Sequence, residues 1–422
     1  MKTTLSILFY FFITSIYSQF NLGVSGSSNF LSDWTNFKPK TTDYKKPNEI
    51  LSGIISSDKK LYRNRTYLLS GIVYVTNKSK LIIESGTIIR VDFQTCGTLV
   101  ITAGASIFAE GEATNPIVFT SSKEASQRNP GDWGGIVILG TAPINRMGGV
   151  GLLNFELDQS LCVYGGNDDN SNSGILRYVR IEFPGRKFNS SKEYNGISLA
   201  GVGRKTIIEN VQVSFSNDDS FECYGGNLTL NRLVSYRATD DDFDFTQGAQ
   251  ATISGSLALR YPYSSDISTS RCFEIDTFDN IEKNDIRSKE TFVVAENMTL
   301  VNNEENNEGL VKEAIYISEK SSFSLTNSLI SGFSKLVLLD KKIECLDFKL
   351  NKIKLKNLLV NNCLGYIESE MSIFNSKIQT FFSNSELNIK ISNIQNKDFF
   401  EDCVNKTDFD FRLKSFDTLS SK

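Results

Sequence analysis

The chain has 422 residues, of which 40% are hydrophobic and 22% are charged, so it can bury one long core or two domains and is not a disordered tail. Its net charge of −4, with Lys and Arg scattered, argues against nucleic acid as a partner, because a phosphate backbone requires a concentrated basic face. Histidine is absent, which excludes Ser-His-Asp and Cys-His catalysis and the usual zinc sites.

Residues 1–18 have the layout of a secretory signal peptide. Lys2 precedes an apolar run from Leu5 to Ile16, and Ser18 offers a cleavage point. The run is too short to span a bilayer, and no later stretch approaches 18 consecutive apolar residues. We therefore expect an exported protein, extracellular or periplasmic, without a membrane span.

Strand-length segments follow a polar start. Residues 19–60 are polar and irregular, and they predict a lead-in or N-terminal cap. From Leu61 onward, short apolar runs rich in β-branched residues recur between Gly, Asn, Ser or Thr, and no long stretch has helical spacing. The clearest runs lie at 81–91, 98–111, 115–122 and 134–140. The pattern predicts an all-β protein.

A repeat of 22 residues sets the register of the central part. Corresponding positions of four consecutive units are Gly174, Gly196, Asp218 and Asp240. A period of 20 to 30 residues made of short strands and turns is typical of a solenoid. A leucine-rich repeat would show a Leu/Asn consensus, and a propeller blade would need roughly 40 residues. A right-handed parallel β-helix with about 22 residues per coil fits best.

The period lengthens toward the C-terminus. Asn297, Asn327 and Asn357 each open a short apolar run, at steps of 30. We interpret these runs as larger coils with loops, and the asparagines as a side-chain ladder at a turn. The alternative is a Lys/Asn-rich tail in which the spacing arises by chance. The β-helix is expected over residues 61–400, with a C-terminal tail at 401–422.

Seven cysteines are spread along the chain without any CxxC pair, which argues against a zinc ribbon or a thioredoxin-like site. An odd number leaves at least one unpaired in an exported protein. Cys345 with Cys363 is the first candidate pair.

The same 22-residue step repeats a cluster of carboxylates, in NDDSFE at 217–222 and in DDDFD at 240–244. If Phe221 and Phe243 face inward, strand alternation turns the acids beside them outward, so that Glu222 lies about 4.8 Å from Asp244 in the next coil. Like charges stacked in this way cost a few tenths to about 1 kcal/mol per pair. Something should offset this repulsion.

Three explanations for how this repulsion is compensated remain open. A calcium ion takes six to eight oxygens, and the candidate ligands are Asp218, Asp219, Asp240, Asp241 and Asp242. A raised pKa on one carboxyl would instead give the acid and base of a glycosidase, with Glu222 and Asp244 near the retaining separation of about 5 Å. Alternatively, the acids are solvated turn residues that cap backbone N–H groups beside arginines.

Trp133, in the run GDWGGIVILG, is a candidate platform for stacking a sugar ring. An aromatic ring beside Gly134 and Gly135 is also compatible with ordinary packing. The sequence leaves both interpretations open.

Six runs together carry a resemblance: AGASIFAEGEATNPIVFTSS, GDWGGIVILGTAPIN, YGGNDDNSNSGILRYVRIEFPG, NGISLAGVG, NVQVSFSNDDSFECYGG and DDDFDFTQG. This part of the chain, about residues 61–262, resembles a large, mostly uncharacterised group of exported proteins of Bacteroidetes and related marine bacteria that are taken to be parallel β-helices. The resemblance implies fold and export but no established activity. Asp218 and Asp219 also look like the paired aspartates of polygalacturonases, whose Gly-His-Gly partner cannot exist in a chain without histidine.

These observations lead to one functional hypothesis and two alternatives. We expect an exported, monomeric β-helix that binds polysaccharide or cell-surface material, with a Ca²⁺ site in the stacked acidic turns. The first alternative is a carbohydrate-active enzyme, either a glycosidase using Glu222 and Asp244 or a Ca²⁺-assisted lyase with Arg204 or Arg237 as base. The second alternative is a passive adhesin without a site.

Overall fold

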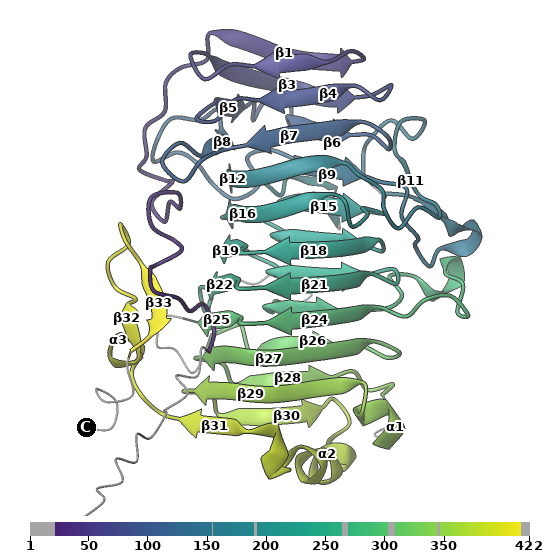
Figure 1. Cartoon of the computed structure of the whole chain (residues 1–422), viewed down its shortest axis with the longest axis vertical. Helices are drawn as coiled ribbons and strands as arrows, with labels where there is room; N and C mark the ends of the chain where they lie inside the picture. Colours follow the sequence, from purple (N-terminus) through teal and green to yellow (C-terminus); the bar gives the residue numbers. More distant parts are fainter. Residues whose placement is uncertain are drawn as a thin grey trace, which may run out of the picture.

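The computed structural model describes residues 22–153, 155–189, 192–263, 269–302, 309–343 and 347–414. These residues form a column of stacked coils in which parallel strands pair from one coil to the next (Figure 1). The prediction of a right-handed parallel β-helix is confirmed. The expected signal peptide at 1–18 and Cys345 of the candidate disulfide lie outside the described residues. No helix in the described part of the chain is long and apolar enough to cross a membrane.

Three parallel sheets make up the walls of the column. Sheet A contains the first halves of β1 (Glu49–Ile55) and β3 (Thr66–Val75), then β5 (Ile88–Val91), β8 (Ile117–Ser121), the second halves of β12 (Gly174–Glu182) and β16 (Ile207–Ser214), β19 (Val234–Tyr236), β22 (Leu257–Arg260), β25 (Thr299–Asn302), the second halves of β27 (Ser322–Ser331) and β29 (Ile353–Asn361), and β31 (Ile389–Ser392). Sheet B contains the second halves of β1 and β3, then β6 (Thr98–Ile101), β9 (Gly135–Leu139), β15 (Ile197–Ala200), β17 (Phe221–Tyr224), β20 (Phe243–Thr246), β23 (Phe273–Ile275), β26 (Glu313–Ile317), β28 (Lys335–Leu339) and β30 (Gly365–Ser369). Sheet C contains β2 (Lys59–Leu61), β4 (Lys80–Ile83), β7 (Ser106–Glu110), the first halves of β12 and β16, β18 (Asn227–Asn231), β21 (Gln250–Ser254), β24 (Phe292–Glu296), and the first halves of β27 and β29.

The remaining elements lie at the edges and ends of the column. Two short hairpins leave it, β10 (Val150–Leu152) with β11 (Val163–Gly165) and β13 (Lys187–Asn189) with β14 (Lys192–Glu193). The short helices are η1 (Met147–Gly149), η2 (Ile281–Lys283), α1 (Asp347–Leu350), η3 (Ser372–Phe374), α2 (Asn375–Phe382), η4 (Ser385–Leu387) and α3 (Asn396–Phe399). A last hairpin pairs β32 (Phe400–Asp402) with β33 (Asp410–Leu413).

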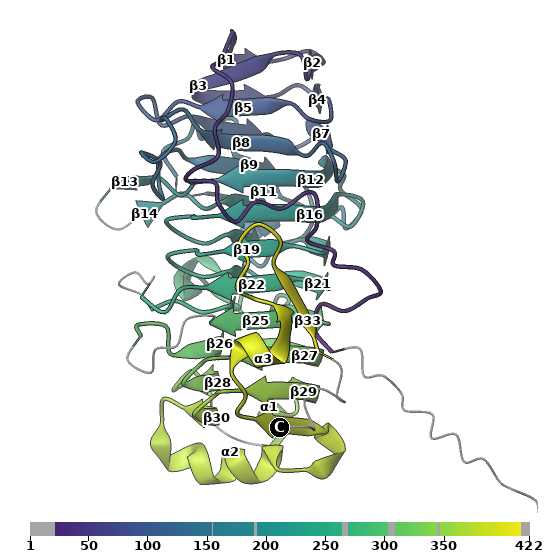
Figure 2. The ribbon, with the colours of Figure 1, turned by 90° about the vertical axis from the view of Figure 1, so that its left-hand side faces the viewer.

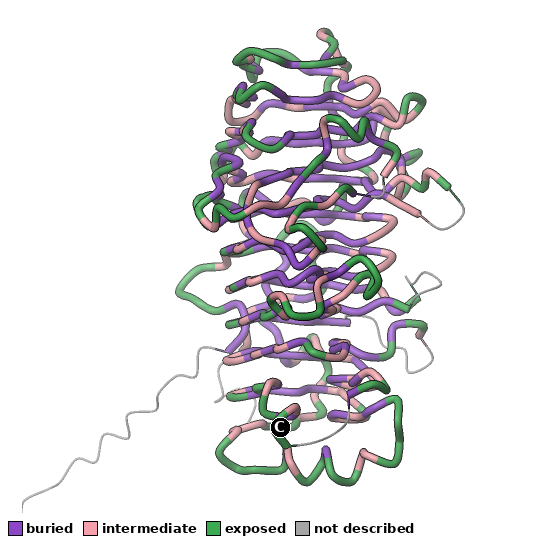
Figure 3. The backbone as a smooth tube through the Cα atoms, turned by 90° about the vertical axis from the view of Figure 1, so that its right-hand side faces the viewer, coloured by how far each residue is buried: buried purple, intermediate pink, exposed green. Residues whose placement is uncertain are grey.

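The core confirms the 22-residue step only from Phe221 to Phe243, since Ile197 of the preceding coil pairs with Phe221 at a step of 24. The expected equivalence of Gly174 and Gly196 is wrong, because Gly174 begins β12 in sheet C whereas Gly196 precedes β15 in sheet B. Phe221 pairs with Phe243 and Glu222 with Asp244. The inward rings of Phe221 and Phe243 stack with centroids 5.5 Å apart, and Phe273 continues the column at 5.2 Å. Buried residues follow the coils of the column, while exposed residues are concentrated in the loops that leave the column (Figure 3). Apolar burial of a continuous core fixes which acids face outward.

The asparagine ladder is also confirmed. Asn297, Asn327 and Asn357 occupy one corner of the column with φ of 54°, 51° and 54°. The Asn357 amide donates to the Asn327 side-chain oxygen at 3.1 Å, and Asn388 donates to Asn357 at 3.0 Å. Asparagine suits this corner because it tolerates positive φ and its amide can bond to the next coil.

We expect Asn357→Ala to lower the free energy of unfolding by about 2 kcal/mol, because alanine is strained at positive φ and two ladder hydrogen bonds are lost. Urea denaturation measures the change. Lys356→Ala, at the exposed neighbouring position, is the control and should change the free energy by less than about 0.5 kcal/mol. Equal effects of the two variants would contradict a role for the ladder.

Segments near the two ends of the described residues cover sheet A. The strap, defined as residues 22–47, and the C-terminal hairpin, defined as residues 396–413, lie along the same side of the column (Figure 2). The apolar residues that they bury include Trp34 and Phe37 of the strap and Phe411 of the hairpin, and the Phe37 ring packs against Tyr236. The reciprocal bonds between Asn36 and Gln212 and the two bonds from Arg128 to strap carbonyl oxygens fix the strap in place.

The structure therefore corrects the expected boundaries. The β-helix begins with β1 at Glu49, so residues 49–60 form the first coil rather than a lead-in. The strap runs along a side of the column, and the 401–422 segment includes a strand that packs on it. Cys96, Cys162, Cys223, Cys272 and Cys363 are free thiols.

Candidate functional site

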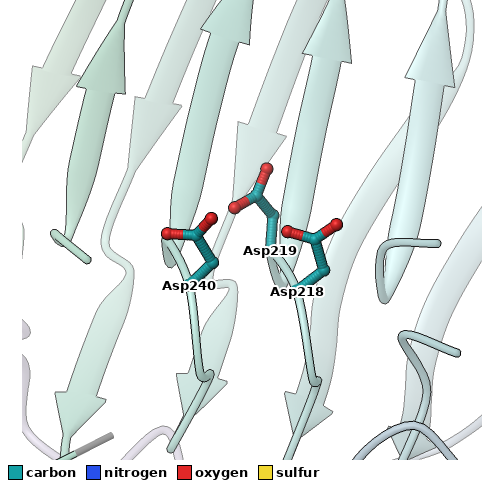
Figure 4. A group of neighbouring side chains, drawn as sticks. All are labelled: Asp218, Asp219 and Asp240. Atoms are coloured by element: carbon teal, nitrogen blue, oxygen red, sulfur yellow. The ribbon is translucent and has the colours of Figure 1, made fainter. Parts of the chain in front are cut away.

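The aspartates at 218, 219 and 240 lie in the turns between sheets A and B, and Glu222 and Asp244 lie in the strands of sheet B that follow these turns. Ser220 N–H donates to the Asp241 carbonyl at 2.9 Å, and Thr239 N–H donates to the Ser216 carbonyl at 2.9 Å. This pairing places Asp218 beside Asp240 in the next coil, as the 22-residue step predicts (Figure 4). The turns stack because the strands that leave them pair residue by residue.

Five carboxylates form one continuous cluster. Oxygen atoms of Asp218, Asp219 and Asp240 lie within 4.8 Å of one another, and so do oxygen atoms of Asp219, Glu222 and Asp244. Asp219 belongs to both groups and is only 6% exposed. Within the described part of the chain, no basic side chain forms an ion pair with Asp219, Glu222 or Asp244. The acids are therefore close together without a neutralising partner for these three.

The electrostatics of the cluster favour protons or a cation. Burial raises the pKa of Glu222 to about 8, against the opposing effect of the hydrogen bond from Tyr224. Burial, followed by the charge of Asp218, raises the pKa of Asp219 well above its usual range, and burial with the charge of Glu222 does the same for Asp244. Oδ1 of Asp244 is buried without a hydrogen-bond partner in the described residues. A carboxylate oxygen in this position lacks the donor that burial normally requires.

Three of the five expected calcium ligands have other roles. Asp241 accepts a hydrogen bond from the backbone N–H of Arg271 in the next coil. Asp242 is fully buried and forms an ion pair with Arg260 at 2.9 Å, where both side chains are 0% exposed. The expectation that Asp242 faces outward is wrong because alternation holds only within a strand, and Asp242 precedes β20 in the turn. Asp219 likewise caps the N–H of Asp241 at 2.9 Å.

Trp133 is not a platform. Its side chain is 0% exposed, its ring stacks on Phe119 at 6.5 Å, and its Nε1 donates to the Glu182 carbonyl at 2.8 Å. The adjacent backbone packs too tightly for a surface position, since a Cβ on Gly134 would lie 2.0 Å from Oγ1 of Thr98. The packing alternative is correct.

Sequence reasoning missed three further residues that join the cluster. Asn195 and Tyr224 donate to Oε2 of Glu222. Glu274 follows Asp244 in the register of sheet B and pairs with Arg271 at 2.6 Å. A Phe-acid-apolar pattern at 221–223, 243–245 and 273–275 could have revealed Glu274. The step from Phe243 to Phe273 is 30 residues instead of 22, which hid the repeat.

The two proposed bases of a lyase have other contacts. Arg204 lies 4.0 Å from Asp169 and is half exposed. The guanidinium of Arg237 lies over the Tyr261 ring, 4.6 Å from its centroid. Neither contact prepares an arginine for proton abstraction.

Parallel coils with carboxylates aligned on one outer face define the class of protein as a parallel β-helix with an acidic site. A family model described as a pectate-lyase-like β-helix domain matches residues 53–401, and the chain belongs to this family. No curated protein and no solved structure matches the chain. Membership of this family fits a carbohydrate-related role.

Proposed function

We propose that this protein is an exported β-helix that binds polysaccharide or cell-surface material, with a calcium ion between the turns at 217–222 and 240–244. The observation that carries the calcium site is the cluster of Asp218, Asp219 and Asp240, whose oxygens lie within 4.8 Å of one another. Calcium–oxygen distances are roughly 2.3–2.6 Å, so ligands of one ion lie at most about 5 Å apart. The donor set therefore fits the ion.

The neighbouring carboxylates extend the site. Asp219 links the three aspartates to Glu222 and Asp244, and the unpartnered Oδ1 of Asp244 offers a further hard oxygen. A bound cation would neutralise part of the stacked charge. Because calcium takes six to eight ligands, positions would remain for water or for sugar oxygens. The long outer face of the solenoid suits an extended chain.

A thermal melt tests the calcium site. In excess EGTA followed by millimolar Ca²⁺, we expect the melting temperature to rise, because an ion that binds only the folded state at 100 times its Kd adds about 2.7 kcal/mol. Asp218→Asn/Asp240→Asn should abolish the rise.

Glu112→Gln/Glu124→Gln is the matched control, since it removes two exposed acids elsewhere on the column and should leave the rise intact. A Ca²⁺-dependent rise of equal size in both double variants would rule out the proposed ligands. No rise in the parent protein would rule out the calcium site.

The raised pKa of Glu222 predicts an unusual dependence on pH. An acid whose pKa increases on folding stabilises the protein fully below its unfolded value near 4.5 and loses this contribution as pH rises through about 8. Each unit of difference corresponds to about 1.4 kcal/mol. With EDTA, we expect the melting temperature to fall between pH 5 and pH 8, and Glu222→Gln to flatten the fall. A higher melting temperature at pH 8 than at pH 5 would contradict this.

A second function is supported by one observation. Glu222 would be protonated at neutral pH and lies within 4.8 Å of Asp244, close to the separation of about 5 Å in retaining glycosidases. In a screen of neutral and acidic polysaccharides, a glycosidase would lose about 10²–10⁴-fold in turnover with Glu222→Gln while remaining folded. Unchanged turnover in that variant would exclude Glu222 as the acid.

A further inference from the structure

A second candidate binding site lies on a different corner of the column. A cleft of about 880 Å³ separates the first part of the strap, from Gly23 to Trp34, from the corner where sheet C meets sheet A. Its size is within the usual range of about 300–1,000 Å³ for small-molecule sites. The acidic cluster occupies the turns between sheets A and B, so the two sites are separate.

The floor of the cleft is a row of equivalent positions from five successive coils. The members of this corner row are Tyr178, Asn210, Arg232, Gly255 and Asn297. Four steps of roughly 4.8 Å give a row of about 19 Å along the column axis. This strand spacing is similar to the repeat of an extended pyranose chain. The floor therefore presents one corner position to each unit of such a chain, with a side chain at four of the five positions.

The side chains of the cleft are those that bind sugars. Asn210 and Asn297 carry amides, and the exposed residues Ser25, Ser27 and Ser28 of the strap carry hydroxyls on the opposite wall. The half-buried ring of Tyr178, packed edge-on against Trp34 with centroids 5.8 Å apart, adds an aromatic surface. Planar amides, hydroxyls and an aromatic ring suit hydroxyl-rich ligands rather than apolar ones.

One positive charge in the cleft has no acidic partner among the described residues. Arg177 is neutralised by Glu209, with which it forms an ion pair. Arg232 is exposed, and no acidic side chain lies within 4.0 Å of its guanidinium in the described residues. A guanidinium binds a carboxylate or a sulfate through two parallel hydrogen bonds. The cleft is therefore suited to an anionic chain.

We propose that the cleft binds an acidic oligosaccharide, with the sugar chain along the corner row and one carboxylate or sulfate on Arg232. The strap forms one wall, so the N-terminal segment has a binding role in addition to covering sheet A. Because the anion meets a guanidinium directly, binding does not require calcium. This separates the cleft from the acidic cluster, where a cation is needed.

Isothermal titration calorimetry in EDTA tests the proposal. The probes are a mannuronate tetramer, which carries carboxylates, a sulfated carrageenan tetramer, and neutral cellotetraose. We expect at least one acidic tetramer to bind, and to bind more tightly than cellotetraose. Arg232→Asn should weaken that binding at least 10-fold while leaving the melting temperature unchanged, since asparagine already occupies this corner at Asn210 and Asn297.

Arg63→Asn is the matched control, because Arg63 is another exposed arginine, on the first coil, and it should not change the affinity. Unchanged affinity in Arg232→Asn would overturn the proposal, as would the absence of binding by both acidic tetramers. Binding that requires Ca²⁺ and is lost in Asp218→Asn/Asp240→Asn would place the sugar on the acidic cluster instead. The comparison of carboxylated and sulfated tetramers identifies the anion.

Discussion

Arg260→Met is expected to lower the free energy of unfolding by about 3–5 kcal/mol, because it leaves a buried carboxylate without its counter-charge. Arg260 and Asp242 are both 0% exposed, and their charged atoms lie 2.9 Å apart. The guanidinium also donates to the carbonyl oxygens of Arg271 at 2.8 Å and Asp240 at 2.7 Å. A single side chain therefore connects the end of β22 to the acidic turn and to the next coil.

Urea denaturation of Arg260→Met and of the double variant Arg260→Met/Asp242→Leu measures this effect. The double variant should recover most of the loss, since an apolar pair of similar volume is often neutral in place of a buried ion pair. Arg287→Met, at a side chain that is 89% exposed, is the control and should cost less than about 0.5 kcal/mol. An equal loss in the single and double variants would show that the stranded charge is not the cause.

Trp34→Ala is expected to cost about 3–5 kcal/mol, the usual range for removing a buried tryptophan. Trp34 is 1% exposed and lies in the apolar layer between the strap and sheet A. Its Nε1 donates to the Phe30 carbonyl at 2.6 Å. The change would leave a cavity between the strap and the outer face of sheet A. If the strap then loosens, the apolar side chains on that face become exposed to solvent, and aggregation is expected.

Urea denaturation and light scattering measure the two consequences. Ile50→Ala removes an apolar side chain that is 65% exposed on β1, and it should change the free energy of unfolding by less than about 0.5 kcal/mol. A loss below about 1 kcal/mol in Trp34→Ala would mean that the strap is dispensable for the stability of the column.

The asparagine ladder and the stacked phenylalanines show why the fold was predictable. Each coil rests on its neighbour in register, so a position that needs positive φ or an inward ring needs it again one coil later. The same residue type therefore recurs in the sequence at a regular spacing. The pairing of Glu222 with Asp244 followed from the same period, because strand alternation connects it to Phe221 and Phe243.

The candidate site was predictable only where it lies in strands or in stacked turns. Asp218, Asp219 and Asp240 come together as the repeat indicates. Asp242 does not join them because the direction of a turn side chain depends on its local backbone and on the distant Arg260. Asn195 was missed because inserted residues change the spacing before Glu222.

Local periodicity was enough to predict the architecture, the 22-residue step between the two coils that carry the acidic turns, and the stacking of those turns. It gave the wrong register for the coils before them, because inserted residues change the step to 24 between Ile197 and Phe221. What covers each face of the column depends on contacts between segments far apart in the sequence. The strap and the C-terminal hairpin meet on sheet A, where Phe37 packs against Phe409, 372 positions later in the sequence (409 − 37 = 372). No period connects these segments to the strands they bury. Burial of Trp133, pairing of Asp242 and formation of the cleft at Arg232 all follow from such long-range contacts.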